Sequence, residues 1–234
     1  MRPWSPIPIE DCGESLRPLP EVLRRMEPHP YMALGAPYGA SGNPFQLRQG
    51  VVQRLLDAQA RLIQHDPSLR LSIFDAWRPI AVQAFMVKHS IEELCRQRGL
   101  EARSGEAFDR VVADVGRFWA DPSRDPATPP PHSTGAAVDL TLSSSCDGTP
   151  LDMGGEIDAI GAVSEPQHYA GREDPEARCW HQRRQLLADV MEAAGFAQHP
   201  NEWWHYSFGD QLWAWRQGEA VAIYAEAVSS ALTS

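Results

Sequence analysis

The chain has 234 residues, of which 43% are hydrophobic, and a formal net charge of −10. This length is enough for one sizeable hydrophobic core and short for two, so we expect a single domain over residues 1–234. The negative charge argues against nucleic acid as a partner, since phosphate binding needs clustered Lys and Arg, and no apolar run approaches the ~20 residues that span a membrane.

Residues 1–48 are rich in Pro and Gly, which predicts an irregular arm wrapped on the domain. The first residues lack the continuous apolar segment and cleavage site of a secretory signal, so we expect a cytoplasmic protein. The four Cys are scattered, without a C-x-x-C pair, and this favours reduced thiols. Cys146 and Cys179 flank one irregular segment and are the pair that could approach each other.

The next segment predicts a helix, a strand and a second helix. Apolar residues recur at helical spacing over 51–65, and apolar residues alternate over 69–73 as in a strand. Pro79 is suited to the first turn of a helix that continues to about Leu94. Arg78 therefore lies at a strand-to-helix junction.

Further along, the pattern predicts a helix over 106–119 and a strand over 137–142. His132 precedes this strand and Asp139 lies within it. Residues seven apart on an extended strand point to opposite faces, so these two side chains can share a metal only if the chain bends between them. Gly135 is the expected bend.

The last third of the chain begins with an irregular segment over 143–177, which we expect to be a functional loop near the active site. A helix is expected over 177–194. A hairpin is expected to join 203–208 to 211–215. A weaker helical pattern covers 220–232.

Two separate segments hold the residue types of a hydrolytic zinc site. A catalytic zinc takes three protein ligands and leaves a fourth position to water, and a further carboxylate works as the base. His132, Asp139 and His205 can be the ligands, which leaves Glu202 as the general base. Asp139 has apolar neighbours in sequence, where a buried carboxylate without a cation would be costly. Each residue taken singly could equally be an ordinary polar residue; the joint pattern favours the metal.

Four segments match the signatures of one known family in order and spacing: Ser72-Ile73-Phe74-Asp75-Ala76-Trp77-Arg78-Pro79, His132-Ser133-Thr134-Gly135-Ala136-Ala137-Val138-Asp139, Met153-Gly154 with Asp158, and Glu202-Trp203-Trp204-His205-Tyr206. Over roughly residues 30 to 215 the chain resembles the zinc D-alanyl-D-alanine dipeptidases of the VanX type. The resemblance implies that Arg78 is catalytic and stabilises the oxyanion, and that Asp158 binds the free ammonium of the substrate. The family usually has a Ser two residues before the first His ligand, where this chain has Pro130, so a contact from that hydroxyl does not carry over.

These observations predict an α+β fold with a central antiparallel sheet, flanking helices and a zinc cleft at one edge. The resemblance implies hydrolysis of D-Ala-D-Ala-like dipeptides with one zinc per chain. Three alternatives remain open: a related peptidoglycan D,D-carboxypeptidase or endopeptidase, a non-catalytic zinc-binding module, and a non-haem iron oxygenase. The presence of both Glu202 and Arg78 argues against a binding module, and an oxygenase leaves Glu202 unexplained. The exact dipeptide, the physiological role and the oligomeric state are not determined by the sequence.

Overall fold

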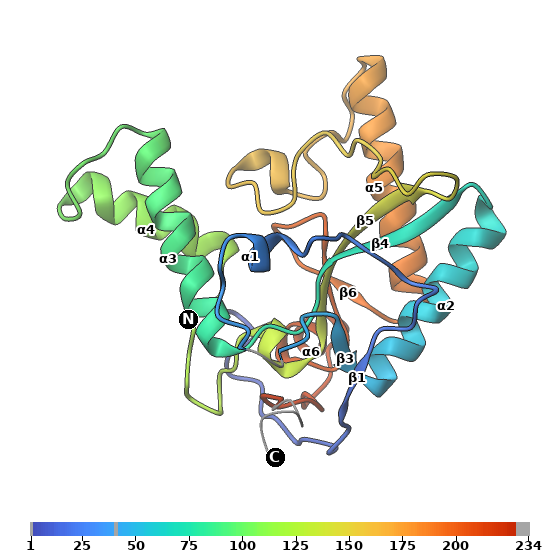
Figure 1. Cartoon of the computed structure of the whole chain (residues 1–234), viewed down its shortest axis with the longest axis horizontal. Helices are drawn as coiled ribbons and strands as arrows, with labels where there is room; N and C mark the ends of the chain where they lie inside the picture. The colour runs from blue at the N-terminus through green and yellow to red at the C-terminus, as the bar shows by residue number, and fades with distance from the viewer. Residues whose placement is uncertain (1, 40–41, 228–234) are drawn as a thin grey trace.

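The computed structural model describes residues 2–39 and 42–227 and contains a five-stranded sheet in the order β2-β4-β5-β7-β6 (Figure 1). β2 pairs parallel to β4, and the other neighbours pair antiparallel. The strands of this sheet are β2 (Arg24–Arg25), β4 (Leu69–Asp75), β5 (Ala137–Ser144), β6 (Ala197–Gln198) and β7 (His205–Ser207). The helices are α1 (Pro30–Ala33), α2 (Gln49–His65), α3 (Ile80–Gln97), α4 (Glu106–Phe118), α5 (Pro175–Ala193) and α6 (Gln211–Gln217), with short 3-10 turns η1 (Pro131–Thr134) and η2 (Ala162–Ser164). The expected α+β class is confirmed.

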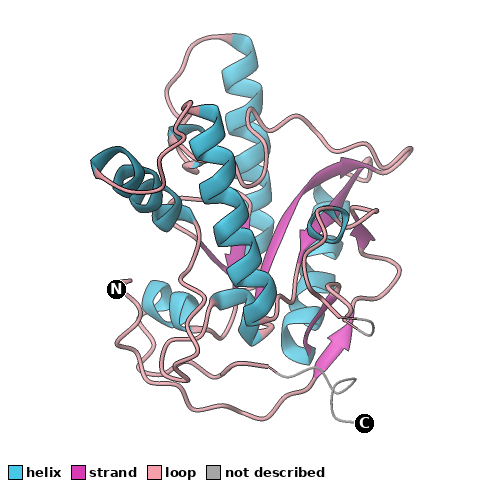
Figure 2. Ribbon diagram, turned by 60° about the vertical axis from the view of Figure 1, so that its left-hand side comes forward, coloured by secondary structure: helices cyan, strands magenta, loops and turns pink. Residues whose placement is uncertain are grey.

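The sheet separates two groups of helices. In Figure 1, α2 and α5 lie on one side of β4 and β5, whereas α3 and α4 project on the other. Alternate residues of β5, beginning with Val138 and Leu140, enter the main core together with apolar residues of α2 and α5. The intervening residues, beginning with Asp139, therefore point to the opposite face. Figure 2 shows the long loops that connect these elements.

A bulge in β4 brings a second carboxylate to the face that carries Asp139. Ile73 pairs with Leu140, and the register then shifts so that Asp75 pairs with Asp139. A bulge inserts one extra residue, here Phe74, and so re-aims the side chains that follow it. The result is that Asp75 and Asp139 are direct cross-strand neighbours.

The arm over residues 1–48 contains more regular structure than the sequence predicts. β1 (Leu16–Pro18) pairs antiparallel with β3 (Gln46–Arg48), and both β2 and α1 also lie within this segment. Ile9 forms an isolated bridge with Ala222 near the other end of the chain. These pairings satisfy backbone groups of the arm through partners that are distant in sequence, which local composition does not reveal.

The hairpin expected across 203–215 is wrong. Its first half forms β7, but β7 pairs with β5 and β6, and residues Gln211–Gln217 form α6. The reason is a helix cap: the carboxylate of Asp210 accepts a hydrogen bond from the backbone N–H of Trp213 at 2.8 Å. The helix expected over 220–232 is also wrong for residues 220–227, which are irregular, and its remainder lies outside the described residues.

Within the described ranges, no helix combines the length and the apolar character needed to cross a bilayer. The four Cys are all free thiols, and only Cys95 among them is buried. The Cys146–Cys179 approach considered from the sequence is therefore not a disulfide in this structure.

Candidate active site

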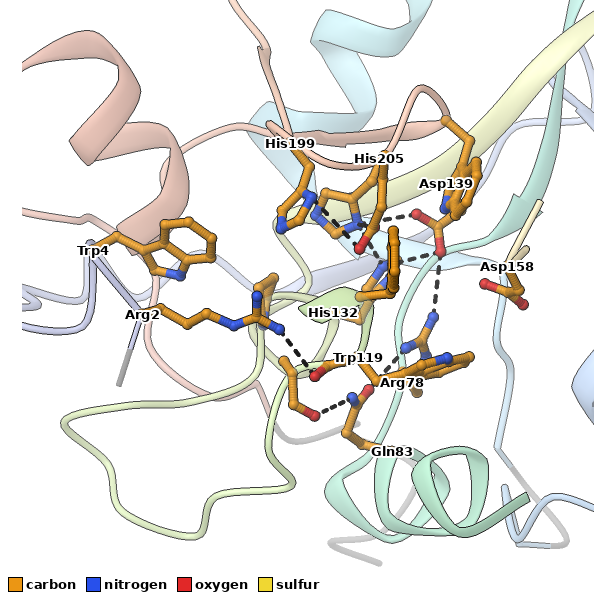
Figure 3. A pocket seen from close by; sticks show the side chains of 15 residues that line it. Arg2, Trp4, Arg78, Gln83, Trp119, His132, Asp139, Asp158, His199 and His205 are labelled. Carbon is orange, nitrogen blue, oxygen red and sulfur yellow. Dashed lines mark hydrogen bonds and ion pairs between the residues drawn. The ribbon is translucent and has the colours of Figure 1, made fainter. Parts of the chain in front are cut away.

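Three ligand-type side chains converge on the face of the sheet opposite the main core (Figure 3). The Nε2 atom of His132 lies 3.2 Å from the Nδ1 atom of His205 and 3.2 Å from Oδ2 of Asp139. Nδ1 of His205 lies 3.0 Å from Oδ1 of Asp139. All three side chains are buried. The structure thus brings together the three residues that the sequence nominates as metal ligands.

Local structure explains this convergence. Asp139 on β5 and His205 on β7 are paired residues of adjacent strands, which places their side chains on one face. His132 lies in η1, and Gly135 ends that turn with a φ of +72° before β5 begins. A positive φ is readily adopted only by glycine, so the chain can bend back here and direct His132 toward Asp139. The predicted bend at Gly135 is confirmed.

The donor set fits a zinc ion. Bonds of about 2.0–2.1 Å in tetrahedral geometry place ligand atoms about 3.3 Å apart, close to the separations found here. Nδ1 of His132 donates to the carbonyl oxygen of Ala76 at 2.7 Å, which fixes the proton on that nitrogen and leaves the Nε2 lone pair facing the other two ligands. Nε2 of His205 lies 3.3 Å from the hydroxyl of Ser207, so its Nδ1 faces the same point.

Glu202 lies beside this group without coordinating geometry of its own. It is buried, and its Oε1 atom has no hydrogen-bond partner in the described part of the chain. Oε2 lies 3.7 Å from Nδ1 of His205, and Oε1 lies 3.5 Å from Nδ1 of His199. Burial raises the pKa of Glu202 well above its usual value, and the negative charges of Asp139 and Asp158 act in the same direction. A carboxylate with a raised pKa and a free oxygen is suited to accept a proton.

Arg78 is buried and held rigidly against the site. Its Nε and Nη2 donate to Oδ2 of Asp75 at 3.0 and 2.7 Å, and its Nη1 donates to Gln83 at 2.8 Å. Nη2 also lies 3.3 Å from Oδ2 of Asp139. Burial acts to lower the pKa of Arg78, but neighbouring Tyr31 and the carboxylates outweigh it and raise the pKa above its usual value. The guanidinium is therefore a permanent, oriented positive charge next to the ligand group.

Asp158 reaches the same cavity from the 143–177 loop. Its backbone has a φ of +65°, which is uncommon outside glycine, and its Oδ2 accepts a hydrogen bond of 2.7 Å from the hydroxyl of Tyr31. Burial, and then the charge of Asp139, raises the pKa of Asp158 to about 7. A cation bound beside this carboxylate would relieve that penalty.

The structure also places in the cavity several residues that sequence reasoning missed, namely Arg2, Trp4, Trp119 and His199. The sequence position of His199, three residues before Glu202, could have pointed to it. Burial, followed by the charge of His205, lowers the pKa of His199, so its ring is neutral. Arg2 and Trp4 have no such signal because they reach the site only through the path of the N-terminal arm.

Comparisons with known proteins show which family the chain belongs to. A family model described as D-ala-D-ala dipeptidase (Peptidase_M15) matches residues 24–224. A Synechocystis protein named D-alanyl-D-alanine dipeptidase is 45% identical over 228 residues, covering 94% of this chain and 92% of that protein. A Streptomyces coelicolor protein of the same name is 39% identical over 80 residues, which cover 34% of this chain and 37% of that protein. A solved structure of VanYB in complex with D-alanine-D-alanine aligns with a TM-score of 0.46 and 14% identity over 77% of this chain and 82% of that chain.

Proposed function

Because this chain belongs to the D-Ala-D-Ala dipeptidase family of peptidases, we propose that it hydrolyses D-Ala-D-Ala and closely related dipeptides. One observation carries the proposal: the ligand atoms of His132, Asp139 and His205 converge beside Glu202. The Oε1 atom of Glu202 has no hydrogen-bond partner among the described residues. Together with Arg78, this arrangement has the groups that metal-assisted peptide hydrolysis needs from the protein, which are metal ligands, a base and a fixed cation.

Zinc is the cofactor in this proposal, and the converging ligand atoms of His132, Asp139 and His205 would hold it. When bound, the ion supplies a Lewis acid that polarises the scissile carbonyl and lowers the pKa of water. The remaining steps belong to side chains of the protein.

Glu202 serves as the general base and then as the general acid. It takes one proton from the attacking water as the new C–O bond forms, and it delivers that proton to the nitrogen of the departing amino acid as the C–N bond breaks. Its raised pKa and its free Oε1 support this role. Arg78 faces the developing negative charge on the carbonyl oxygen and stabilises it, since its guanidinium is already fixed before substrate binds.

We expect Arg78→Lys and Arg78→Ala to lower kcat in that order, with a smaller change in KM. Lysine keeps the charge but not the planar fork, and alanine removes both, so an interaction made mainly in the transition state is weakened stepwise. Steady-state kinetics measure the split. Because Arg78 also binds Asp75, thermal unfolding of each variant must be measured alongside. Unchanged kcat with an altered KM in both variants would instead indicate a substrate-anchoring role.

Asp158 supports a dipeptidase over an open-cleft carboxypeptidase. A free dipeptide carries an ammonium one residue before the scissile bond, and a carboxylate in this cavity can pair with it. We expect Asp158→Asn to lower kcat/KM for the free dipeptide by roughly ten- to a hundredfold. An N-acetylated dipeptide has no ammonium, so it should be a poor substrate of the wild type and lose little more in the variant. Equal cleavage of the free and acetylated forms by the wild type would favour the carboxypeptidase.

The experiment that tests the proposed function is turnover on a panel of D,D, L,D and L,L dipeptides beside an N-acylated tripeptide. Preferred cleavage of the free D,D dipeptide supports the proposal, and cleavage of the tripeptide alone contradicts it. We further infer that the substrate comes from peptidoglycan metabolism, because D-Ala-D-Ala is a wall component. A cytoplasmic location stays a prediction.

A further inference from the structure

The cavity contains a second arginine, Arg2, on the side of the ligand group away from Asp158. Figure 3 shows its guanidinium entering from the N-terminal arm, with His132 and His205 between it and Asp158. The cavity thus has a carboxylate at one end and a guanidinium at the other. A free dipeptide is a zwitterion with the same separation of charges.

Arg2 is held in place by the end of α4 and by its own arm. Its Nη2 donates to the carbonyl oxygens of Gly116 and Trp119 at 2.8 and 3.0 Å, and its Nη1 donates to that of Arg117 at 2.9 Å. Two residues along, the buried Trp4 ring packs edge-on against His199 with 5.6 Å between ring centroids. These contacts fix the arm in the wall of the cavity.

The positive charge of Arg2 has no matching carboxylate at contact distance among the described residues. Its three side-chain hydrogen bonds within the described residues all go to carbonyl oxygens, which leaves two of the five guanidinium N–H groups available. Burial lowers the pKa of Arg2, and the charge of Glu202 opposes this effect. A half-buried cation without a counter-ion is stabilised when an anion binds beside it. Arg78, by contrast, already pairs with two carboxylates, Asp75 and Asp139.

The wall between Arg2 and the ligand group offers few other donors for an anion. Pro131 lines the cavity and follows Pro129 and Pro130, and none of the three has a backbone N–H. The side-chain amide of Gln83 is already bound to the carbonyl oxygen of Ala120 at 2.7 Å. Arg2 is therefore the charged donor best placed to receive an anionic group at this end of the cavity.

We propose that Arg2 binds the carboxylate of the dipeptide substrate, so that Arg2 and Asp158 recognise its two charged ends across the metal site. This inference rests on the proposed function. It makes the N-terminal arm part of the substrate site and a determinant of specificity for substrates with a free carboxylate directly after the scissile bond.

The test compares D-Ala-D-Ala with its C-terminal amide, which lacks the negative charge. The wild type should prefer the free acid by roughly ten- to a hundredfold in kcat/KM. Arg2→Gln keeps hydrogen-bond donors for the carbonyls of α4 but loses the charge. This variant should lose most of the preference for the free acid, mainly through a higher KM for that substrate. Its activity on the amide should stay nearly unchanged. Arg2→Lys should retain part of the preference.

Arg54 provides a matched control. It is also half-buried and also donates to a carbonyl oxygen at a helix end, that of Ala194 after α5, but it does not line the cavity. Arg54→Gln should leave the preference for the free acid intact.

Two results would overturn the inference. Arg2→Gln could lower activity on the acid and the amide equally, as expected if Arg2 only holds the arm in place, or it could leave both activities unchanged. A wild type that hydrolyses neither compound would contradict the proposed function itself, which is a separate outcome.

Discussion

Glu202→Gln should reduce turnover by about 10²–10⁴-fold or more while the protein keeps its zinc, because glutamine preserves the shape of the side chain but cannot accept a proton. The carboxylate is buried, its Oε1 has no hydrogen-bond partner in the part of the chain that the structure describes, and its Oε2 lies 3.7 Å from Nδ1 of His205. Steady-state kinetics together with elemental analysis measure both quantities on one preparation. Loss of zinc along with activity would show that Glu202 is a ligand.

The same substitution should not destabilise the metal-free protein. A carboxyl group whose pKa is raised by burial keeps its proton in the folded state at a pH where the unfolded chain has released it. The free energy of unfolding therefore falls as the pH rises above the unfolded pKa. At pH 8, Glu202→Gln in chelated protein should therefore unfold at the same or a higher temperature than the wild type. Glu106→Gln, at a highly exposed position in α4, is the control for both measurements and should change neither. A large fall in Tm would contradict this account of Glu202.

Local patterns in the sequence predicted the longer helices and the two long strands well. The helix expected over 51–65 is α2 (Gln49–His65), and the strand expected over 137–142 is β5 (Ala137–Ser144). The failures lie where a partner distant in sequence decides the structure. β1 exists because β3 pairs with it, and β7 takes β5 as its partner in place of the segment that follows it.

The candidate site was predictable to the extent that its residues lie in compact motifs. His132 and Asp139 share one segment, and Glu202 and His205 share another, so two short motifs taken together predicted the site. The structure adds that β5 and β7 pair these motifs directly. Arg2 could not be found this way, because its contacts with residues 116–119 depend on the path of the arm around the domain. The chemical roles of all these residues stay predictions.

Removal of the metal should have the second large effect. Protein purified without added metal should contain close to one zinc per chain. His205→Ala should lose both the zinc and the activity, because two protein ligands bind the ion much more weakly than three. Removal of a bound ion whose free concentration is about a thousand times its Kd lowers the free energy of unfolding by about 4 kcal/mol. For a chain of this length we expect Tm to fall by roughly 8–16 °C after chelation and to recover when zinc is restored.

His168→Ala is the matched control for the metal, since His168 lies outside the cavity and contacts Arg172 at 3.3 Å. It should keep its zinc, its activity and its response to chelation. Elemental analysis that finds iron in place of zinc would favour the oxygenase alternative, because both metals accept two His and one carboxylate. Stoichiometric zinc that persists when His132, Asp139 and His205 are all replaced by alanine would place the metal elsewhere in the chain, and the convergence of these three side chains would then need another explanation.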